Sequence, residues 1–226
     1  KVIPPLPSLL QLMGKKPCSG EGGRSEFRVF RVFRGKTPPM RITGGVLGGR
    51  RLTVMPGVRP TQDKVRQAIF SALGDAIAGV RVLDLFAGTG ALGLEAYSRG
   101  AGSVLWVEQN PRTAAKLAET VKALCPEAGR VVQADALTHL RRAAGQGAYE
   151  LVLADPPYDR DGERAWLEKT LPLLEAGSIV TPRGVLVFEM SAEEAPVARA
   201  GWELIWDRTY GDTRVCMWQR EARGEV

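Results

Sequence analysis

From residue 81 onward, short apolar runs alternate with segments that carry the period of an amphipathic helix. The runs are apolar at nearly every position, so we expect each to be a strand that is buried on both faces. Strands of this kind that are separated by helices form a parallel sheet with helices on each side. The pattern therefore predicts an α/β fold with parallel strands at 81–86, 103–108, 130–134, 149–155 and 184–190.

The end of the pattern differs because no helix separates its last two strands. Residues 202–210 and 213–220 have the composition of strands, and Gly211 and Asp212 between them are typical of a hairpin turn. A hairpin adds antiparallel strands to the edge of a sheet. The full prediction is a Rossmann-like, mostly parallel, seven-stranded sheet with a C-terminal antiparallel hairpin.

The helices carry recognisable start signals. Thr61 is a candidate N-cap for a helix from about residue 62, in which apolar residues recur at helical spacing. Asn110 and Pro111 predict the cap and the first turn of a helix that runs to about residue 124. Both signals precede segments that can cover the sheet.

The net charge of +6 comes from the front of the chain. Residues 1–39 hold eight Lys and Arg against two acids, whereas residues 40–226 hold 23 of each sign. Global basicity is therefore a poor argument for a nucleic-acid partner. Locally, residues 40–66 hold six bases against Asp63 alone, so this segment is suited to holding phosphates.

The same front segment sets the expected domain boundaries. Residues 1–39 show no sustained period, and Met40 begins a well-patterned segment in a chain that opens on Lys1. We expect 1–39 to be a non-native or disordered basic extension, with a strand or an RNA-binding tail at 27–35 as the alternative. The other expected units are a basic β-hairpin at 40–60, the main domain at 61–220 and a tail at 221–226.

The chain lacks the sequence features of several classes of function. Cys18, Cys125 and Cys216 are scattered without the CxxC spacing of a zinc site, which fits a reducing compartment. The single histidine, His139, argues against histidine-based metal or triad chemistry, and we interpret it as an ordinary helix residue. No apolar run approaches the roughly 20 residues that span a bilayer. We expect a cytoplasmic monomer without metal or membrane contact.

Acids and glycines gather where the predicted strands end. The first strand runs into DLFAGTG, in which Gly88 and Gly90 permit a tight turn and a close approach to a ligand. The glycine spacing matches a dinucleotide fingerprint, which is a weak signal by itself. Asp84, Glu108 and Asp135 can hold a cationic amine, ribose hydroxyls and an adenine amino group, although Glu108 and Asp135 taken singly also fit plain polar strand ends. Together the acids suit S-adenosylmethionine, a sulfonium without phosphates.

The fourth strand ends in DPPY, residues 155–158. An exocyclic amino group of a base is a poor nucleophile because its lone pair is delocalised into the ring. The Asp155 carboxylate and the Pro156 carbonyl can accept its two hydrogens, and the two prolines fix these acceptors in place. Tyr158 can stack on a base that is rotated out of its helix. The alternative for DPP alone is a helix N-cap.

These motifs together resemble class I S-adenosylmethionine-dependent amino-methyltransferases. More narrowly, the chain resembles the RsmD-type family in the succession MRITGG, GRRL, RPTQDKVRQAIF, DLFAGTGALGLEA, DPPY and YGDT. That family methylates N2 of a guanine in small-subunit (16S) ribosomal RNA. The RPT segment and YGDT separate it from DNA adenine methyltransferases that share DPPY.

The resemblance, which covers Met40 to about residue 220, implies a role for each segment. It implies that DPPY forms the methyl-transfer site, with Asp155, Pro156, Pro157 and Tyr158. The implied cofactor-binding residues are Asp84, Phe86, Gly88, Gly90, Glu108, Asp135, Ala136 and Thr61. The implied contacts to ribosomal RNA, in the small subunit or an assembly intermediate, are Arg41, Arg50, Arg51, Arg59 and Arg66. Residues 210–213 would close the far wall, or form a plain hairpin turn.

Other functions stay open at this point. A DNA or tRNA amino-methyltransferase, acting on adenine N6 or guanine N2, would use the same motifs, although no separate target-recognition segment is evident. A non-catalytic RNA-binding assembly factor would have no physical need for DPPY. An NAD-linked dehydrogenase leaves DPPY unexplained and is the weakest alternative.

Overall fold

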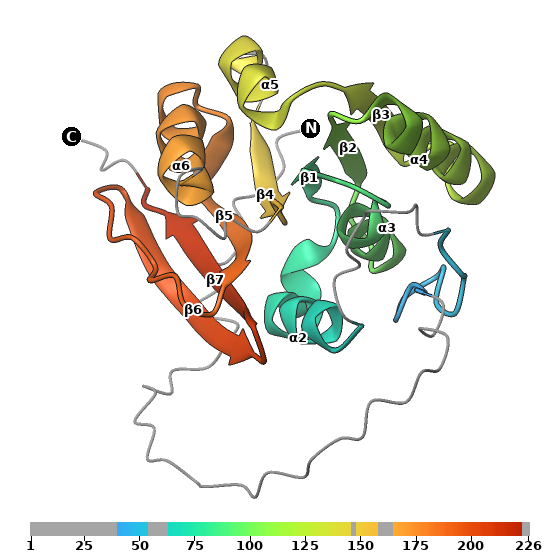
Figure 1. Cartoon of the computed structure of the whole chain (residues 1–226), viewed down its shortest axis with the longest axis horizontal. Helices are drawn as coiled ribbons and strands as arrows, with labels where there is room; N and C mark the ends of the chain where they lie inside the picture. The colour runs from blue at the N-terminus through green and yellow to red at the C-terminus, as the bar shows by residue number, and fades with distance from the viewer. Residues whose placement is uncertain (1–39, 54–62, 146–147, 158–164, 223–226) are drawn as a thin grey trace, which may run out of the picture.

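The computed structural model describes residues 40–53, 63–145, 148–157 and 165–222. In this part of the chain a seven-stranded sheet has the strand order β3-β2-β1-β4-β5-β7-β6 (Figure 1). The pairs among β1 to β5 are parallel, whereas β7 is antiparallel to both β5 and β6. The predicted mostly parallel sheet with a C-terminal hairpin is confirmed. The expected extension at 1–39 lies outside the described residues.

The strands and helices follow the predicted order, with small shifts at their ends. The strands are β1 Arg81–Leu85, β2 Ser103–Glu108, β3 Gly129–Gln133, β4 Tyr149–Ala154, β5 Val180–Ser191, β6 Trp202–Tyr210 and β7 Thr213–Arg220. The helices are α2 Asp63–Leu73, the short 3-10 helix η1 Gly74–Ile77, α3 Ala91–Ser98, α4 Pro111–Leu124, α5 Ala136–Ala143 and α6 Trp166–Ala176. Asn110 caps α4 as predicted, because its side chain accepts from the amides of Arg112 and Thr113.

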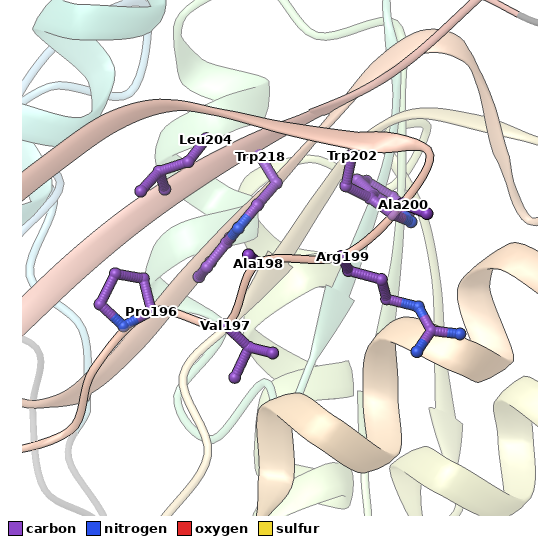
Figure 2. Close-up of a pocket in the computed structure, with 8 residues that line it drawn as sticks. All are labelled: Pro196, Val197, Ala198, Arg199, Ala200, Trp202, Leu204 and Trp218. Carbon is purple, nitrogen blue, oxygen red and sulfur yellow. The ribbon is translucent and has the colours of Figure 1, made fainter.

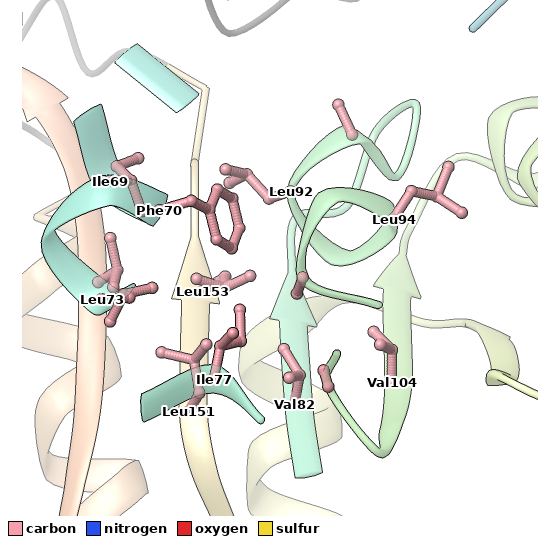
Figure 3. Packing of buried hydrophobic residues seen from close by; sticks show 14 of the residues in the cluster. Ile69, Phe70, Leu73, Ile77, Val82, Leu92, Leu94, Val104, Leu151 and Leu153 are labelled. Atoms are coloured by element: carbon pink, nitrogen blue, oxygen red, sulfur yellow. The ribbon is translucent and has the colours of Figure 1, made fainter. Parts of the chain in front are cut away.

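The two faces of the sheet build two separate cores. Because side chains alternate along a strand, Val82 and Leu83 of β1 enter opposite cores. The first core lies under α2, α3 and α4, and Figure 3 shows Ile69 and Phe70 of α2 packed over Leu153 of β4. The second core lies under α5 and α6. Burial on both faces is the reason why the parallel strands are apolar throughout.

The segment 40–53 is attached to α3 rather than to the edge of the sheet. Met40, Ile42 and Leu52 are buried in the first core. The segment turns back on itself with a single antiparallel bridge between Arg41 and Arg51. The described part of the predicted hairpin is present as a short antiparallel pairing rather than as two extended strands, since the Ile42 amide donates to the Arg50 carbonyl at 2.9 Å and the Leu52 amide to the Met40 carbonyl at 2.8 Å. Its turn is held on α3, where the Val46 amide donates to the carbonyl oxygen of Ser98 at 2.8 Å.

Glu95 of α3 is the main anchor of this segment. Its side chain is completely buried, and it accepts from the Thr43 amide and the Thr43 hydroxyl, each at 2.7 Å. The Arg99 guanidinium, one turn further on, donates to the same carboxylate at 2.8 Å. A buried charge needs such partners, since its desolvation otherwise costs several kcal/mol.

We predict that Glu95→Ala lowers the free energy of unfolding by about 3 kcal/mol, because it leaves two Thr43 donors and a guanidinium without their acceptor. Urea denaturation measures the change. Glu193→Ala, at an exposed position after β5, is the control and should shift the free energy by less than about 0.5 kcal/mol. Equal effects of the two substitutions would contradict the anchoring role.

Candidate active site

The paired strands β1, β2 and β4 end at the same height. Leu85 of β1 lies beside Val107 of β2 and beside Ala154 of β4. Glu108 and Asp155, one residue further on, are therefore level with each other at the carboxyl edge of the sheet. By strand alternation both face the side of the sheet that carries α2, α3 and α4. Ligands of parallel α/β sheets bind outside this edge.

Asp84 completes a group of three carboxylates. Its side chain is buried, and its Oδ2 atom accepts from the Gly93 amide of α3 at 2.9 Å. Burial raises the pKa of Asp84 well above its ordinary value, the Gly93 hydrogen bond opposes this shift, and the charges of Asp155 and Glu108 add to it. Asp84 thus lies within electrostatic reach of both Glu108 and Asp155.

The glycine turn after β1 has a backbone that side chains would obstruct. Gly88 and Gly90 have φ angles of 53° and 76°, and a Cβ atom at Gly90 would lie 2.3 Å from the side chain of Leu117. Phe86 also has a positive φ of 57°, which is strained for a residue with a side chain. The Gly88 amide donates to Oε2 of Glu108 at 2.8 Å, so the second strand tip fixes the turn of the first.

Glu108 and Asp135 use part of their hydrogen-bonding capacity on the protein itself. Oε1 of Glu108 accepts from the Asn110 amide at 2.7 Å. Asp135 caps α5 through the Thr138 amide at 2.8 Å, directly before the buried Ala136. A carboxylate has about four acceptor sites, so both can also accept from ribose hydroxyls or an amino group. With the glycine turn, these residues fit S-adenosylmethionine.

The DPP tip of β4 is tied to the rest of the edge by Trp166, which the sequence analysis missed. Pro156 is buried and Pro157 is exposed. The Trp166 ring nitrogen donates to the Pro157 carbonyl at 3.0 Å, and its ring meets Phe86 edge-on at 5.1 Å between centroids. Trp166 therefore connects the DPP motif to Phe86 in the turn after β1. Its position as the first residue of an amphipathic helix gave no signal of this role.

The predicted RNA-binding arginines divide into two groups. Arg50 and Arg51 are exposed, and so is Arg41, whose side chain keeps 63% of its surface beside Asp63. Arg66 is completely buried and donates to the Arg41 carbonyl at 2.6 Å. Its burial does not fit the predicted phosphate contact and indicates that it holds α2 against the segment 40–53.

Three further predicted residues, Arg59, Thr61 and Tyr158, lie outside the described residues. Residues 210–213 form the β6–β7 turn, and Thr213 pairs with Ser191 at the end of β5. This turn therefore lies at the carboxyl edge of the sheet, as the resemblance implied. Whether it closes a pocket stays a prediction.

A hollow of about 370 Å³ lies on the other face of the sheet, where α6 packs (Figure 2). Trp202 of β6, Trp218 of β7 and the loop 196–200 line it. Both tryptophans belong to the second core, so the sheet separates this hollow from the three acids. Among the described residues, no cluster of potential metal ligands and no helix long and apolar enough to cross a membrane is found.

Comparison with known proteins supports the motif analysis. The family model described as "Conserved hypothetical protein 95" matches residues 40–219. "Ribosomal RNA small subunit methyltransferase D" of Escherichia coli (strain K12) is 35% identical over 189 residues, which cover 82% of this chain and 92% of that protein. Its namesake from Haemophilus influenzae is 30% identical and covers 76% and 89%. The solved structure named "Putative methyltransferase yhhF from Escherichia coli" superposes with a TM-score of 0.72 at 35% identity, covering 81% and 99%.

We predict that Asp84→Asn weakens S-adenosylmethionine binding at least tenfold and leaves the protein at least as stable as before. Because the pKa of Asp84 is raised well above its ordinary value, ionising this residue costs more in the folded than in the unfolded protein, and this penalty grows as pH rises from the ordinary pKa to the raised one. Asparagine keeps an acceptor for Gly93 and cannot ionise. Calorimetric titration and melting curves at several pH values measure both effects. Unchanged affinity would contradict a cofactor role.

We predict that Trp166→Phe lowers kcat for methyl transfer about tenfold and changes the KM for S-adenosylmethionine less than threefold. Phenylalanine keeps the ring against Phe86 but cannot donate to the Pro157 carbonyl, so only the transfer site loosens. Steady-state kinetics measure both constants. Trp202→Phe, in the hollow lined by Trp218 and the loop 196–200, is the control. A KM effect larger than the kcat effect would assign Trp166 to the cofactor site instead.

Proposed function

The chain belongs to the family of Conserved hypothetical protein 95, the RsmD-type methyltransferases, and on this premise we propose that it methylates N2 of a guanine in 16S ribosomal RNA. As an S-adenosylmethionine-dependent rRNA methyltransferase, it acts at the carboxyl edge of its sheet. The observation that carries the proposal is the DPP tip, which lies level with Glu108 at the carboxyl edge of the sheet and is tied by Trp166 to Phe86 in the turn after β1. The small ribosomal subunit or an assembly intermediate is the proposed source of the RNA.

The chemical task of the DPP tip is to expose the lone pair of the amino group. The Asp155 carboxylate and the Pro156 carbonyl accept the two hydrogens of N2, so the nitrogen moves toward tetrahedral geometry. The buried Pro156 and the bond from Trp166 to Pro157 hold these acceptors before the base arrives. The cofactor, when bound, supplies an electrophilic methyl group on a sulfonium.

The electron and proton balance needs no further reactant. The N2 lone pair forms the new bond to the methyl carbon, while the pair of the breaking carbon–sulfur bond stays on sulfur. N2 then carries one proton too many. Asp155, which already accepts a hydrogen bond from this nitrogen, or water takes up that proton after transfer. Positioning is therefore the main contribution of the protein.

The surface near this edge supports an RNA substrate. Arg50 and Arg51 are exposed on the segment beside α3. On edge strand β6, the near-parallel rings of Trp206 and Tyr210 lie 6.4 Å apart, and the exposed Arg208 guanidinium lies 5.8 Å from the Trp206 ring centre. Guanidinium groups bind phosphates and aromatic rings stack on unpaired bases, which together suit a structured RNA with a displaced base.

Labelled S-adenosylmethionine tests the proposal directly. Small subunits, deproteinised rRNA and genomic DNA, each from cells that lack this gene, are offered as substrates, and nuclease digestion identifies the modified base. We predict N2-methylguanine in the small subunit or its RNA. Label in DNA adenine or in tRNA would establish one of the alternative amino-methyltransferases. Cofactor binding without any transfer would favour an assembly factor.

Asp155→Ala should abolish this transfer, by at least about a thousandfold, and leave S-adenosylmethionine affinity within about threefold of the unchanged chain. The reason is that Asp155 contacts the amino group rather than the cofactor in this mechanism. Asp75→Ala, an exposed aspartate in η1 before β1, is the matched control and should keep full activity. If the Asp155 variant lost cofactor binding, Asp155 would be a cofactor-binding residue, and the proposed contact with the amino group would be wrong.

A further inference from the structure

Glu189 of β5 is a buried acid that the mechanism above does not use. It is only 7% exposed, in a strand whose neighbouring residues Phe188 and Met190 belong to the second core. Glutamate is rarely buried so far without a structural or functional need. Its position in the sheet indicates which need it serves.

Strand register places Glu189 next to the methyl-transfer residue. Ala154 of β4 pairs with Phe188 of β5, so Asp155 and Glu189 are the next residues on two adjacent parallel strands. Adjacent strands are about 4.8 Å apart. Side chains alternate along a strand, and Val187 and Leu153 both lie in the first core. Glu189 and Asp155, each two residues further on, therefore face the same side of the sheet.

The neighbour of Glu189 on its other side is apolar. Val215 of β7 pairs with Glu189 and is completely buried. Arg208 of β6 pairs in turn with Val215, so a row at one height runs from Asp155 through Glu189 and Val215 to Arg208. Glu189 is therefore the acidic residue that lies beside Asp155 on the side toward β6.

Guanine presents the matching pattern. Its N2 amino group and its N1–H are adjacent donors on one edge, whereas adenine has an acceptor at N1. Ionised carboxylates only accept, so two carboxylates side by side match two adjacent donors and repel an acceptor. Enzymes that take a base out of its stack read it by hydrogen bonds to this edge.

Resting on the proposed function, we infer that Glu189 accepts a hydrogen bond from N1–H of the target guanine and so selects guanine at the transfer site. Glu189 thereby acts as a specificity-determining residue, while Asp155 holds the reacting amino group. A purine without a hydrogen at N1 places two acceptors against each other in a buried site. Sites built for a hydrogen bond reject such analogues strongly.

The test compares two RNAs that differ only at the mapped target position, one with guanine and one with 2-aminopurine. The analogue keeps the reacting amino group but has an unprotonated N1. We predict that the unchanged chain prefers guanine by about a hundredfold or more in kcat/KM. In Glu189→Gln this preference should fall below about tenfold, because the amide can donate to N1 of the analogue.

Two further variants separate recognition from folding. Glu193→Gln removes a nearby exposed charge and should keep the full preference. Glu189→Asp keeps a carboxylate and should keep the preference at a lower rate. Because the preference is a ratio within each variant, a reduced fraction of folded protein does not change it.

The possible outcomes distinguish a failure of this inference from a failure of the proposed function. A wild-type preference that survives unchanged in Glu189→Gln, or no preference in the unchanged chain, overturns the role of Glu189 alone. If the unchanged chain forms no N2-methylguanine in any ribosomal RNA, the proposed function fails and this inference fails with it.

Discussion

The site depends on strand register. β1, β2 and β4 are paired so that their last residues lie level, and this alone brings Glu108 and Asp155 together from positions 47 residues apart. Asp84 joins them because alternation turns it to the same face of the sheet. A slip of one residue in β4 would turn Asp155 to the opposite face, away from the cofactor edge.

Burying carboxylates costs folding free energy, and the buried Glu95, Glu108 and Asp84 each make contacts that explain their burial. Glu95 holds the segment 40–53 on α3, and Glu108 fixes the glycine turn through the Gly88 amide. Asp84 has a single backbone donor in Gly93, and burial together with its acidic neighbours raises its pKa. Such an acid gains most when a cationic ligand is bound nearby. The ionised form of Asp84 is thus disfavoured in the protein alone, which is consistent with a role in binding a cationic cofactor.

The sequence predicted those features that follow from local pattern. The bounds of β6 and β7, the Asn110 cap and the three strand-tip acids are all properties of a few neighbouring residues. The roles of Trp166 and Arg66 were not predictable in this way. Trp166 matters because its ring meets Phe86, 80 positions earlier in the chain, and Arg66 because the Arg41 carbonyl lies above it. Contacts between distant segments leave no periodic signal, so a basic helix residue was taken for a phosphate contact.

A division of labour follows from where each group is attached. The proposed acceptors for the reacting base directly follow β4 or lie in β5, and the flanking strands and two cores of these strands permit little movement. The exposed arginines belong to the segment 40–53 and to edge strand β6, which have fewer neighbours. Rigid attachment suits the transfer site, because a displacement of about 1 Å there can cost a factor of 100 in rate. Phosphate contacts tolerate more movement, since charge attraction falls slowly with distance. For the proposed function, the fold therefore provides rigid positions at the centre of the sheet for the transfer site and exposed basic groups at its margins for RNA.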